Sequence, residues 1–306
     1  MKHLIIANHS AGTNKNADEF NAKVSEAFNG LDYEVYETTG PRSVIPFLRE
    51  YLAKHTKDTI RVYACGGDGT VHEVVNGLVG FNNVELAILA VGTGNDFVKI
   101  YGGKEKFQDF KTLIASEAKP VDLSKVTGGK LDEPWYSINV INFGFDAMVG
   151  AIGNQNKIKG KKDPYGFGHA ILPAICKGRF NKIIISADGE QLNKKKLLLG
   201  SVAQGQWIGG EYHASPKSVN TDGLMDVCVC KTMTLLGLLI GLFGKYHDGK
   251  HLDTPSTAKK FYYRKAKVVE MSAPADVDIC LDGEMIRGDH FKIECVPNAI
   301  KLVIPE

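Results

Sequence analysis

Residues 60–78 read IRVYACGGDGTVHEVVNGL, which is an apolar run, a glycine-rich turn and a segment with helical spacing. The same order begins again at residues 86–96, which read LAILAVGTGND. Because glycine has no Cβ, backbone N–H groups in such turns can converge on an anion, and the positive end of a following helix adds to the attraction. Each turn also carries a carboxylate, Asp68 or Asp96. The sequence therefore predicts that two strand–loop–helix units bind nucleotide phosphates.

Strand and helix patterns alternate along residues 1–125 around these two turns. The expected strands lie at 4–7, 33–36, 60–65 and 86–91, and the expected helices at 17–28, 44–53 and 71–78. This alternation predicts a doubly wound α/β domain, in which helices cover both faces of a parallel sheet. Ligands bind beyond the carboxyl ends of the strands in such sheets, and both glycine-rich turns fall there.

Residues 126–306 have a different sequence pattern, in which short apolar runs rich in β-forming residues are separated by turn residues. This pattern predicts a mainly β, antiparallel sandwich-like domain, whose last strand is a candidate to return to the first domain. The expected strands lie at 135–143, 182–187, 197–202, 225–230, 268–272, 277–281, 291–296 and 300–304. Helical insertions are expected near 168–177 and 235–245.

Composition narrows the class of protein. A length of 306 residues favours two domains, and a net charge of +2 argues against nucleic-acid binding. The six cysteines include no Cys-x-x-Cys pair, which indicates free thiols in a reducing compartment rather than zinc or redox sites. The N-terminal apolar run is too short for a signal peptide, and residues 235–243 fall short of the roughly 20 residues of a membrane span. We therefore expect a cytoplasmic protein without a transmembrane segment.

Common nucleotide-binding motifs are missing from the sequence. It contains no Gly-x-x-x-x-Gly-Lys-Ser/Thr loop, no protein-kinase catalytic sequences, and no Gly-x-Gly-x-x-Gly at the first strand turn. If the chain uses ATP, its phosphate cradle must be of another kind.

Short motifs follow the glycine-rich turns in a fixed order. They are Pro120-Val121-Asp122-Leu123, Gly144-Phe145-Asp146-Ala147, Asp222-Gly223-Leu224-Met225-Asp226 and Leu281-Asp282-Gly283-Glu284. From Asn8 to Pro305 the series resembles the soluble bacterial diacylglycerol kinases, a lipid kinase family related to sphingosine kinases and, more distantly, to NAD kinases. The resemblance implies an ATP-dependent, magnesium-using kinase. Its expected reaction transfers the γ-phosphoryl group to a lipid hydroxyl, converting diacylglycerol to phosphatidic acid.

The resemblance also implies a set of nucleotide contacts. The family's loop after the first strand corresponds here to Asn8, His9, Ser10, Ala11 and Gly12, with His9 in place of the usual proline. A nucleotide-contacting threonine after the second strand would be Thr38, with Thr39 as the alternative. The remaining implied contacts are Gly66, Gly67, Asp68, Gly69, Thr70, Val71, His72, Glu73, Thr93 and Asn95. We expect His72 to be packed or solvated rather than catalytic.

Two magnesium sites follow from the same resemblance. Asp68 would hold one ion against the ATP oxygens through water, and Asp96 and Asp122 would extend this acidic network. Capping of a helix by Asp96 and a loop turn at Asp122 are the alternatives. A second, structural ion would be held by the Asp222 carboxylate and by the carbonyls of Val219 and Leu224. Thr221 stands where the family often has a second acid.

The general base is expected in Asp282-Gly283-Glu284. A carboxylate there would accept the proton of the acceptor hydroxyl, and we assign Glu284 this role, with Asp282 as rival or partner. Asp-Gly is also a strong hairpin signal, and it occurs at 188, 222 and 248 as well. Asp282 and Glu284 would share a face if the strand continued through Gly283.

The sequence leaves several alternatives for the acceptor and the partners of the protein. A lipid at a membrane surface is the expected substrate, entering between the domains. The apolar run 235–243 would be either a core helix, which we favour, or a contact with the lipid or bilayer. The lysine runs at 157–162 and 194–196 fit solvated loops better than a membrane-facing patch. A sphingoid base, another lipid or NAD is the alternative acceptor, and a catalytically silent nucleotide-binding regulator is the alternative class. Members of the family are often dimers, so a homodimer is a further option.

Overall fold

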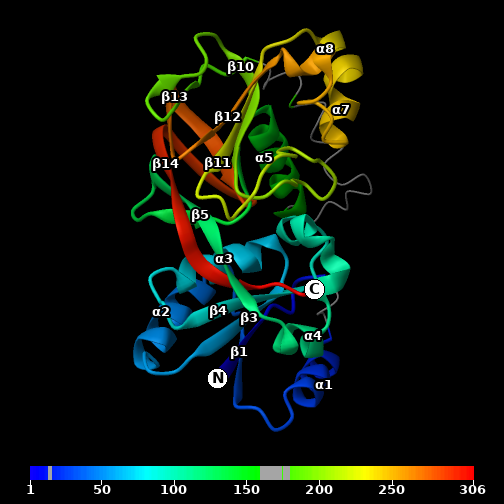
Figure 1. Cartoon of the computed structure of the whole chain (residues 1–306), viewed down its shortest axis with the longest axis vertical. Helices are drawn as coiled ribbons and strands as arrows, with labels where there is room; N and C mark the ends of the chain where they lie inside the picture. Colours follow the sequence, from blue (N-terminus) through cyan, green and yellow to red (C-terminus); the bar gives the residue numbers. More distant parts are fainter. Residues whose placement is uncertain (13–15, 159–173, 175–179) are drawn as a thin grey trace. The chain divides into compact units, whose positions relative to one another are not determined.

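A computed structural model describes residues 1–12, 16–158, 174 and 180–306, with the backbone alone at 153–158. The chain forms two compact units, one of Met1–Leu123 with Pro297–Glu306, and the other of Ser124–Val296 (Figure 1). The two-domain architecture expected from the sequence is confirmed. The chain passes between the units within two strands, β5 (Ala118–Gly128) and β14 (Glu284–Val303).

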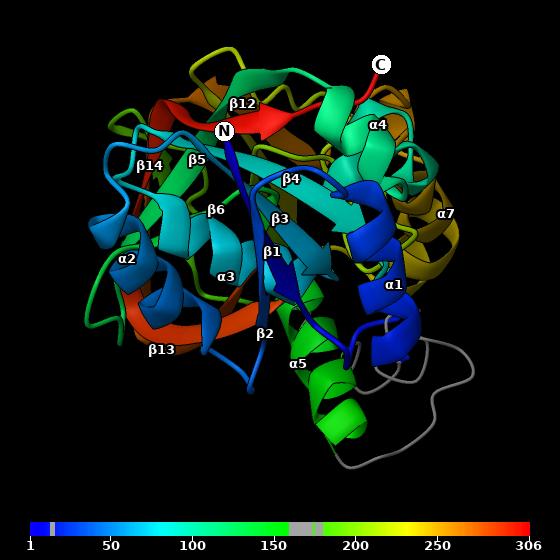
Figure 2. The ribbon, with the colours of Figure 1, turned by 90° about the horizontal axis from the view of Figure 1, so that it is seen from below.

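The first unit is built on a parallel sheet in the order β4-β3-β1-β2, and Leu302 of β14 pairs in parallel with Leu86 of β4. Figure 2 shows α2 and α3 on one side of these strands and α1 and α4 on the other. The elements are β1 (Lys2–Ala7), α1 (Ala17–Ala27), β2 (Tyr33–Glu37), α2 (Val44–Lys54), β3 (Ile60–Gly66), α3 (Asp68–Leu78), β4 (Val84–Ala90), η1 (Phe97–Tyr101), η2 (Lys104–Phe107) and α4 (Phe110–Ala115).

Local sequence explains these elements. Every residue of β3 is buried, as expected of a central strand with helices on both faces. The Asn16 side chain accepts the Glu19 N–H and so begins α1, whose Phe20 side chain packs against Phe110 of α4. The helix expected after the second glycine-rich turn is η1, a five-residue 3-10 helix rather than an α-helix.

The second unit is an antiparallel assembly in which the order is β12-β11-β10-β7-β13, with β8 and β14 also pairing with β13 and β5 pairing with β6. Its further elements are β6 (Trp135–Ser137), β7 (Val140–Gly144), α5 (Phe145–Ile158), β8 (Ile184–Ala187), β9 (Glu190–Gln191), β10 (Leu197–Ala203), β11 (Met225–Lys231), η3 (Gly237–Leu242), α7 (Phe243–His247), α8 (Pro255–Ala258), β12 (Phe261–Ala266) and β13 (Val268–Leu281).

The strands of this unit separate two apolar clusters. In β11, Val227 and Val229 belong to one cluster, whereas Cys228 and Cys230 belong to the other. This alternation follows from the period of two residues in a strand. Both clusters are buried, so the sequence of the second unit specifies a sheet that is covered on two faces.

Several expected boundaries in this unit are wrong. The strands expected at 268–272 and 277–281 form one strand, β13, with a register shift between Ser272 and Val277 where Pro274 lies. Proline cannot donate to the ladder, and strands accommodate it at such irregularities. The strands β5 and β12 and the helix α5 were not predicted, and the expected helix at 168–177 lies outside the described residues except for Ala174. Within the described ranges, each helix is too short or too polar to span a bilayer.

Candidate active site

The first glycine-rich turn lies at the junction of β3 and α3. Gly66 is the last residue of β3, and Gly67 is the N-cap of α3, so Asp68, Gly69 and Thr70 form the first helical turn. The N–H groups of a first turn have no intrahelical acceptor, and they point where the helix dipole is positive. This end of α3 is therefore suited to bind an anion such as a phosphate.

Three segments that follow neighbouring strands touch one another at this point. A Cβ on Gly12 would lie 1.6 Å from the Val91 carbonyl oxygen, and a Cβ on Gly92 would lie 2.4 Å from the Gly67 Cα. The Asn8 Nδ2 donates to Thr70 Oγ1 over 2.9 Å and adds a side-chain link between two of the segments. Glycine is required at these positions because any side chain would push the backbones apart.

Asp68 links the two glycine-rich turns. Its Oδ2 accepts the Asn95 N–H at 2.9 Å, and its Oδ1 accepts the Asp96 N–H at 2.7 Å. The Asn95 Nδ2 in turn donates to the Gly66 carbonyl oxygen over 3.0 Å. Asn95 has a φ of +47°, a conformation that asparagine tolerates better than most residues. Asp68 thus fixes the shape of the second turn as well as its own.

The carboxylates of Asp68 and Asp96 lie on the same side of the second turn. A Cβ on Gly94 would lie 2.8 Å from Asp68 Oδ2 and 3.8 Å from Asp96 Oδ2, so both oxygens border one small space. Asp96 Oδ1 also accepts from the Lys99 ammonium at 2.6 Å, and no side-chain cap bond from Asp96 to η1 is formed. Magnesium commonly uses one or two carboxylates together with waters and substrate phosphates, so these residues fit such an ion. The described residues contain no cluster of three or more potential ligands that would form an all-protein cage.

The other implied contacts in the first unit have varied positions. Glu73 accepts the Arg42 N–H at 2.8 Å and the Val44 N–H at 3.1 Å, so its carboxylate holds the start of α2. His72 is only 2% exposed on α3, as expected of a packed side chain. Asp122 lies in β5 rather than in a loop turn, and its Oδ1 accepts the Asn298 N–H at 2.8 Å.

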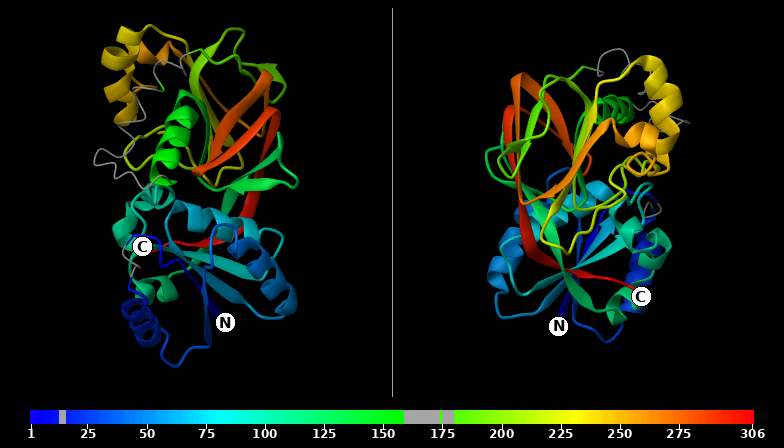
Figure 3. Two further views of the ribbon diagram at one scale, coloured as in Figure 1. Left: turned by 180° about the vertical axis from the view of Figure 1, so that it is seen from behind. Right: turned by 45° about the horizontal axis from the view of Figure 1, so that its top comes forward.

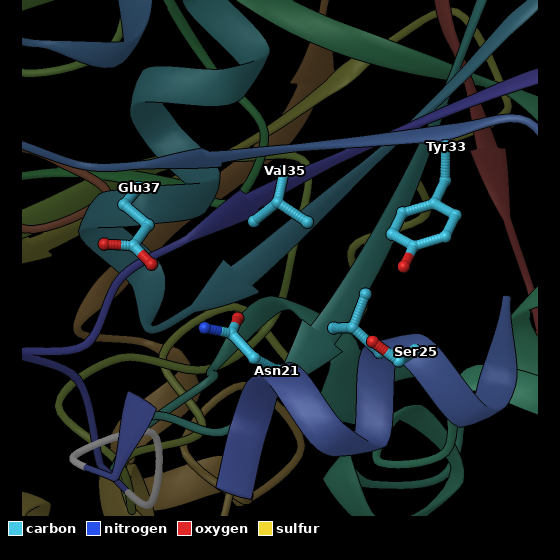
Figure 4. Close-up of a pocket in the computed structure, with 6 residues that line it drawn as sticks. Asn21, Ser25, Tyr33, Val35 and Glu37 are labelled. Carbon is cyan, nitrogen blue, oxygen red and sulfur yellow. The ribbon is translucent and has the colours of Figure 1, made fainter. Parts of the chain in front are cut away.

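The first unit also has a hollow between α1 and β2, shown in Figure 4. Its lining residues are Asn21, Val24, Ser25, Tyr33, Val35 and Glu37. None of these residues was predicted to bind a ligand, and none comes from a glycine-rich turn. The hollow therefore does not coincide with the predicted phosphate site.

In the second unit, Asp282-Gly283 forms the tight turn between β13 and β14. Both residues have positive φ, +50° and +103°, as the common two-residue hairpin turn requires. The strand therefore ends at Leu281, which pairs with Glu284, and the condition under which Asp282 and Glu284 would share a face is not met. The hairpin signal of Asp-Gly is confirmed at this position.

The Asp282 carboxylate accepts from four donors of one segment. Its Oδ1 accepts the Ser137 hydroxyl at 2.6 Å and the N–H groups of Asn139 and Val140, each at 3.1 Å. Its Oδ2 accepts the Ile138 N–H at 3.1 Å, and the residue is 9% exposed. Glu284 is exposed, and its carboxylate makes no hydrogen bond or ion pair with any residue in the described ranges. Of the two acids, Glu284 is therefore the one accessible to a substrate proton.

Asp222, the implied ligand of a structural magnesium ion, is held by protein groups. Its Oδ1 accepts the Leu224 N–H at 3.1 Å, and its Oδ2 contacts the Lys265 ammonium. Lys265 pairs across the ladder with Asp226, a fully buried acid that also accepts from the Tyr263 hydroxyl. Burial raises the pKa of Asp226. An ion at Asp222 would have to displace the Lys265 ammonium.

Sequence reasoning did not identify Lys265 as a partner of Asp222, although the two residues are in direct contact. Only the alignment of β11 with β12 places the lysine there. A second omission is the pair formed by Asp146 of α5 and Tyr246 of α7, in which the hydroxyl donates to the carboxylate over 2.5 Å. Burial raises the pKa of Asp146 to about 7, although the bond from Tyr246 opposes the shift. Asp146 belongs to the Gly144-Phe145-Asp146-Ala147 motif, which was the available signal.

Comparisons with known proteins decide the family. The diacylglycerol kinase catalytic domain matches residues 2–126, and the YegS C-terminal NAD kinase beta sandwich-like domain matches residues 139–304. The chain belongs to the family of diacylglycerol kinase-like and YegS-like lipid kinases. A relative from Alcanivorax borkumensis named "Probable lipid kinase YegS-like" is 28% identical, over 85% of this chain and 83% of its own. A diacylglycerol kinase from Bacillus subtilis is 25% identical, over 94% and 92%.

Solved structures share the fold of this lipid kinase family member. A diacylglycerol kinase from Bacillus anthracis has a TM-score of 0.70 at 23% identity, covering 99% of this chain and 96% of that one. An NAD kinase from Archaeoglobus fulgidus, in complex with ATP, has a TM-score of 0.51 at 13% identity, covering 100% and 94%. At these identities the likeness concerns the fold alone.

Proposed function

We propose that the chain is an ATP-dependent lipid kinase that phosphorylates the hydroxyl of diacylglycerol. The observation that carries the proposal is the cradle in the first unit. Glycines from three loops pack too closely for side chains, the first turn of α3 presents N–H groups, and Asp68 holds the second turn in place. Phosphoryl transfer depends mainly on positioning and charge stabilisation, which such a cradle supplies.

The residues have distinct proposed roles. The N–H groups of the first turn of α3 bind and orient phosphate oxygens, and Asp68 with Asp96 would hold magnesium. When bound, that ion neutralises charge on the phosphates. Glu284 accepts the proton of the acceptor hydroxyl, because its carboxylate is exposed and unpaired among the described residues. Asp282 positions the segment 137–140 instead of taking the proton.

Two alternatives are kept. The structural likeness to an NAD kinase leaves NAD and other hydroxyl acceptors, including sphingoid bases, as candidates for the same chemistry. A catalytically silent nucleotide-binding regulator is the other candidate. Such a protein would not need an exposed carboxylate at the position where the family resemblance implies the general base.

The purified chain tests the proposal directly. We expect ATP consumption with diacylglycerol in mixed micelles, with phosphatidic acid as product, to exceed consumption with sphingosine or NAD. Turnover on NAD alone would overturn the lipid assignment, and ATP binding without turnover on any acceptor would favour the regulator.

A glycine pair tests the cradle itself. Gly12→Ala should weaken ATP binding by about tenfold or more, because the new Cβ meets the Val91 carbonyl. Gly30→Ala is the matched control, since Gly30 also has a positive φ but has no neighbour within 4 Å of a new Cβ. Equal ATP affinity in the two variants, measured by calorimetry, would contradict the cradle.

A further inference from the structure

The segment formed by η3 and the residues just before it has an exposed apolar face. Leu235, Leu236, Leu239 and Ile240 are 41%, 68%, 49% and 77% exposed. On the opposite side of the same segment, Leu238 and Leu242 are 3% and 1% exposed and belong to an apolar cluster of the second unit. The sequence-based expectation of a core helix is therefore correct for one face only.

The four exposed side chains form one surface, which we call the η3 face. They fall in two pairs four residues apart, 235 with 239 and 236 with 240. Such pairs lie on one side of a helix, including the π-helix that η3 forms. A helix at the surface of a soluble domain normally turns polar residues outward. Residues 232–247 contain no aspartate or glutamate, so the η3 face has neither a polar covering nor an acidic residue of its own.

Four lysines lie on the elements next to the segment that carries the η3 face. Lys231 ends β11 just before the segment, and its Nζ donates to the Lys259 carbonyl over 2.9 Å. Lys259 and Lys260 directly follow α8, which packs against η3, and Lys245 lies in α7 (yellow to orange in Figure 3). Within the described parts of the chain, none of these four lysines forms an ion pair with a carboxylate.

We infer that the η3 face docks on a lipid bilayer that carries anionic headgroups. The aliphatic side chains enter the interface between headgroups and acyl chains, where burial of apolar area supplies affinity. The four lysines remain at headgroup level and attract phosphates, so the charge selects anionic membranes. The inference deepens the proposed function, on which its purpose rests, by naming the surface that would bring a lipid kinase to its substrate.

Vesicle sedimentation tests the η3 face without reference to catalysis. We expect the full chain to bind vesicles of equimolar phosphatidylcholine and phosphatidylglycerol, and to bind phosphatidylcholine alone far more weakly. Leu236→Ser with Ile240→Ser should reduce partitioning about tenfold or more, because two exposed aliphatic anchors are lost. Leu31→Ser with Val35→Ser is the matched control, since it removes two exposed apolar side chains of the first unit.

Charge reversal tests the lysines. Lys259→Glu with Lys260→Glu should reduce binding to the anionic vesicles about tenfold and weaken its dependence on salt. The control, Lys194→Glu with Lys195→Glu, changes the net charge equally but lies in another lysine run. Equal losses in both variants would show diffuse attraction and would overturn the assignment to the η3 face.

Other results would also overturn the assignment of the η3 face as the membrane-docking surface. Failure of the wild type to bind either vesicle would do so, as would unchanged binding by the Leu236→Ser and Ile240→Ser variant. If this variant instead converts a dimer to a monomer in analytical ultracentrifugation while vesicle binding persists, the η3 face is a subunit interface. Activity measurements distinguish a failure of this inference from a failure of the proposed function. The Leu236→Ser and Ile240→Ser variant should phosphorylate a water-soluble short-chain diacylglycerol normally and should lose turnover on an acceptor embedded in vesicles. A wild type inactive on every acceptor would refute the proposed function, while vesicle binding would still test the surface.

Discussion

Asp68-Gly69 and Asp282-Gly283 are the same dipeptide in two different settings. Asp68 begins a helix after a parallel strand, is half-buried, and receives two N–H groups from the next glycine-rich turn. Asp282 lies in a hairpin between antiparallel strands, is buried, and receives four donors from residues 137–140. The comparison teaches that an acid next to glycine is suited to chemistry only where its carboxylate remains accessible.

The two settings give the two aspartates different expected roles, one in turnover and the other in stability of the fold. Asp68 shares a small space with Asp96 beside Gly94, which is where we propose that the ion and the phosphates bind. Asp282 stabilises the second unit, and the neighbouring Glu284 is left exposed. Substitutions should therefore affect activity at Asp68 and Glu284, and stability at Asp282.

The largest effect is expected at Asp68. Asp68→Ala removes the proposed magnesium ligand and the two hydrogen bonds that hold the second turn, so turnover should fall by at least about 10³-fold. Thermal unfolding should stay cooperative, because the helix and its apolar contacts persist. Asp18→Ala is the control, since Asp18 is an exposed acid in the first turn of α1. Near-normal turnover of Asp68→Ala would refute its role at the phosphates.

The second-largest effect is expected at Glu284, where Glu284→Gln should lower kcat by about 10²–10⁴-fold. The change keeps the size of the side chain and removes the proposed proton acceptor, so unfolding by urea should be unaltered. Asp289→Asn, at an exposed acid on the same strand, should keep full activity. If Asp282→Asn lowers kcat per folded molecule more than Glu284→Gln does, then Asp282 is the base and the comparison fails.

Asp282→Ala should lower the free energy of unfolding by about 4 kcal/mol. Three buried backbone N–H groups and the Ser137 hydroxyl lose their acceptor, and each unsatisfied group costs about 1–3 kcal/mol before relaxation. Asp188→Ala tests a second Asp-Gly hairpin, where the acid is exposed and where, among the residues that the structure describes, only the Lys267 and Val268 N–H groups donate to it. For Asp188→Ala we expect the free energy of unfolding, measured with urea, to fall by about 1 kcal/mol. Similar losses in the two variants would show that the number of donors does not matter.

The smallest effect concerns Lys265. Lys265→Met should cost about 1 kcal/mol or less, because the ion pair with Asp222 is partly exposed. Without nucleotide, magnesium should not raise the Tm of the wild type through Asp222, but it should raise the Tm of the variant, in which the ammonium is gone. A magnesium-dependent rise in the wild type that Asp222→Ala abolishes would restore the metal site implied by family resemblance.

Local patterns in the sequence were enough for much of the fold. Helical and strand periodicity placed β1, α1, β2, α2, β3, α3 and β4 to within a few residues, because each is set by neighbours along the chain. The β domain was recognised as a class, but β13 and β14 were divided at residues that read as turns, and β5 was missed. Long strands tolerate such residues when pairing with neighbours on both sides holds them in place.

The sequence by itself determined the glycine-rich turns, the family and the acids available for chemistry, since these depend on residue type and order. Only the tertiary structure decided what each acid touches. Asp68 meets Asn95 and Asp96, Glu73 meets Arg42 and Val44, and Lys265 contacts Asp222. These partners are 27 to 43 positions apart in the chain, and no periodic pattern links them. Hydrogen bonds act over about 3 Å, so strand order and register settle which carboxylates remain accessible for function.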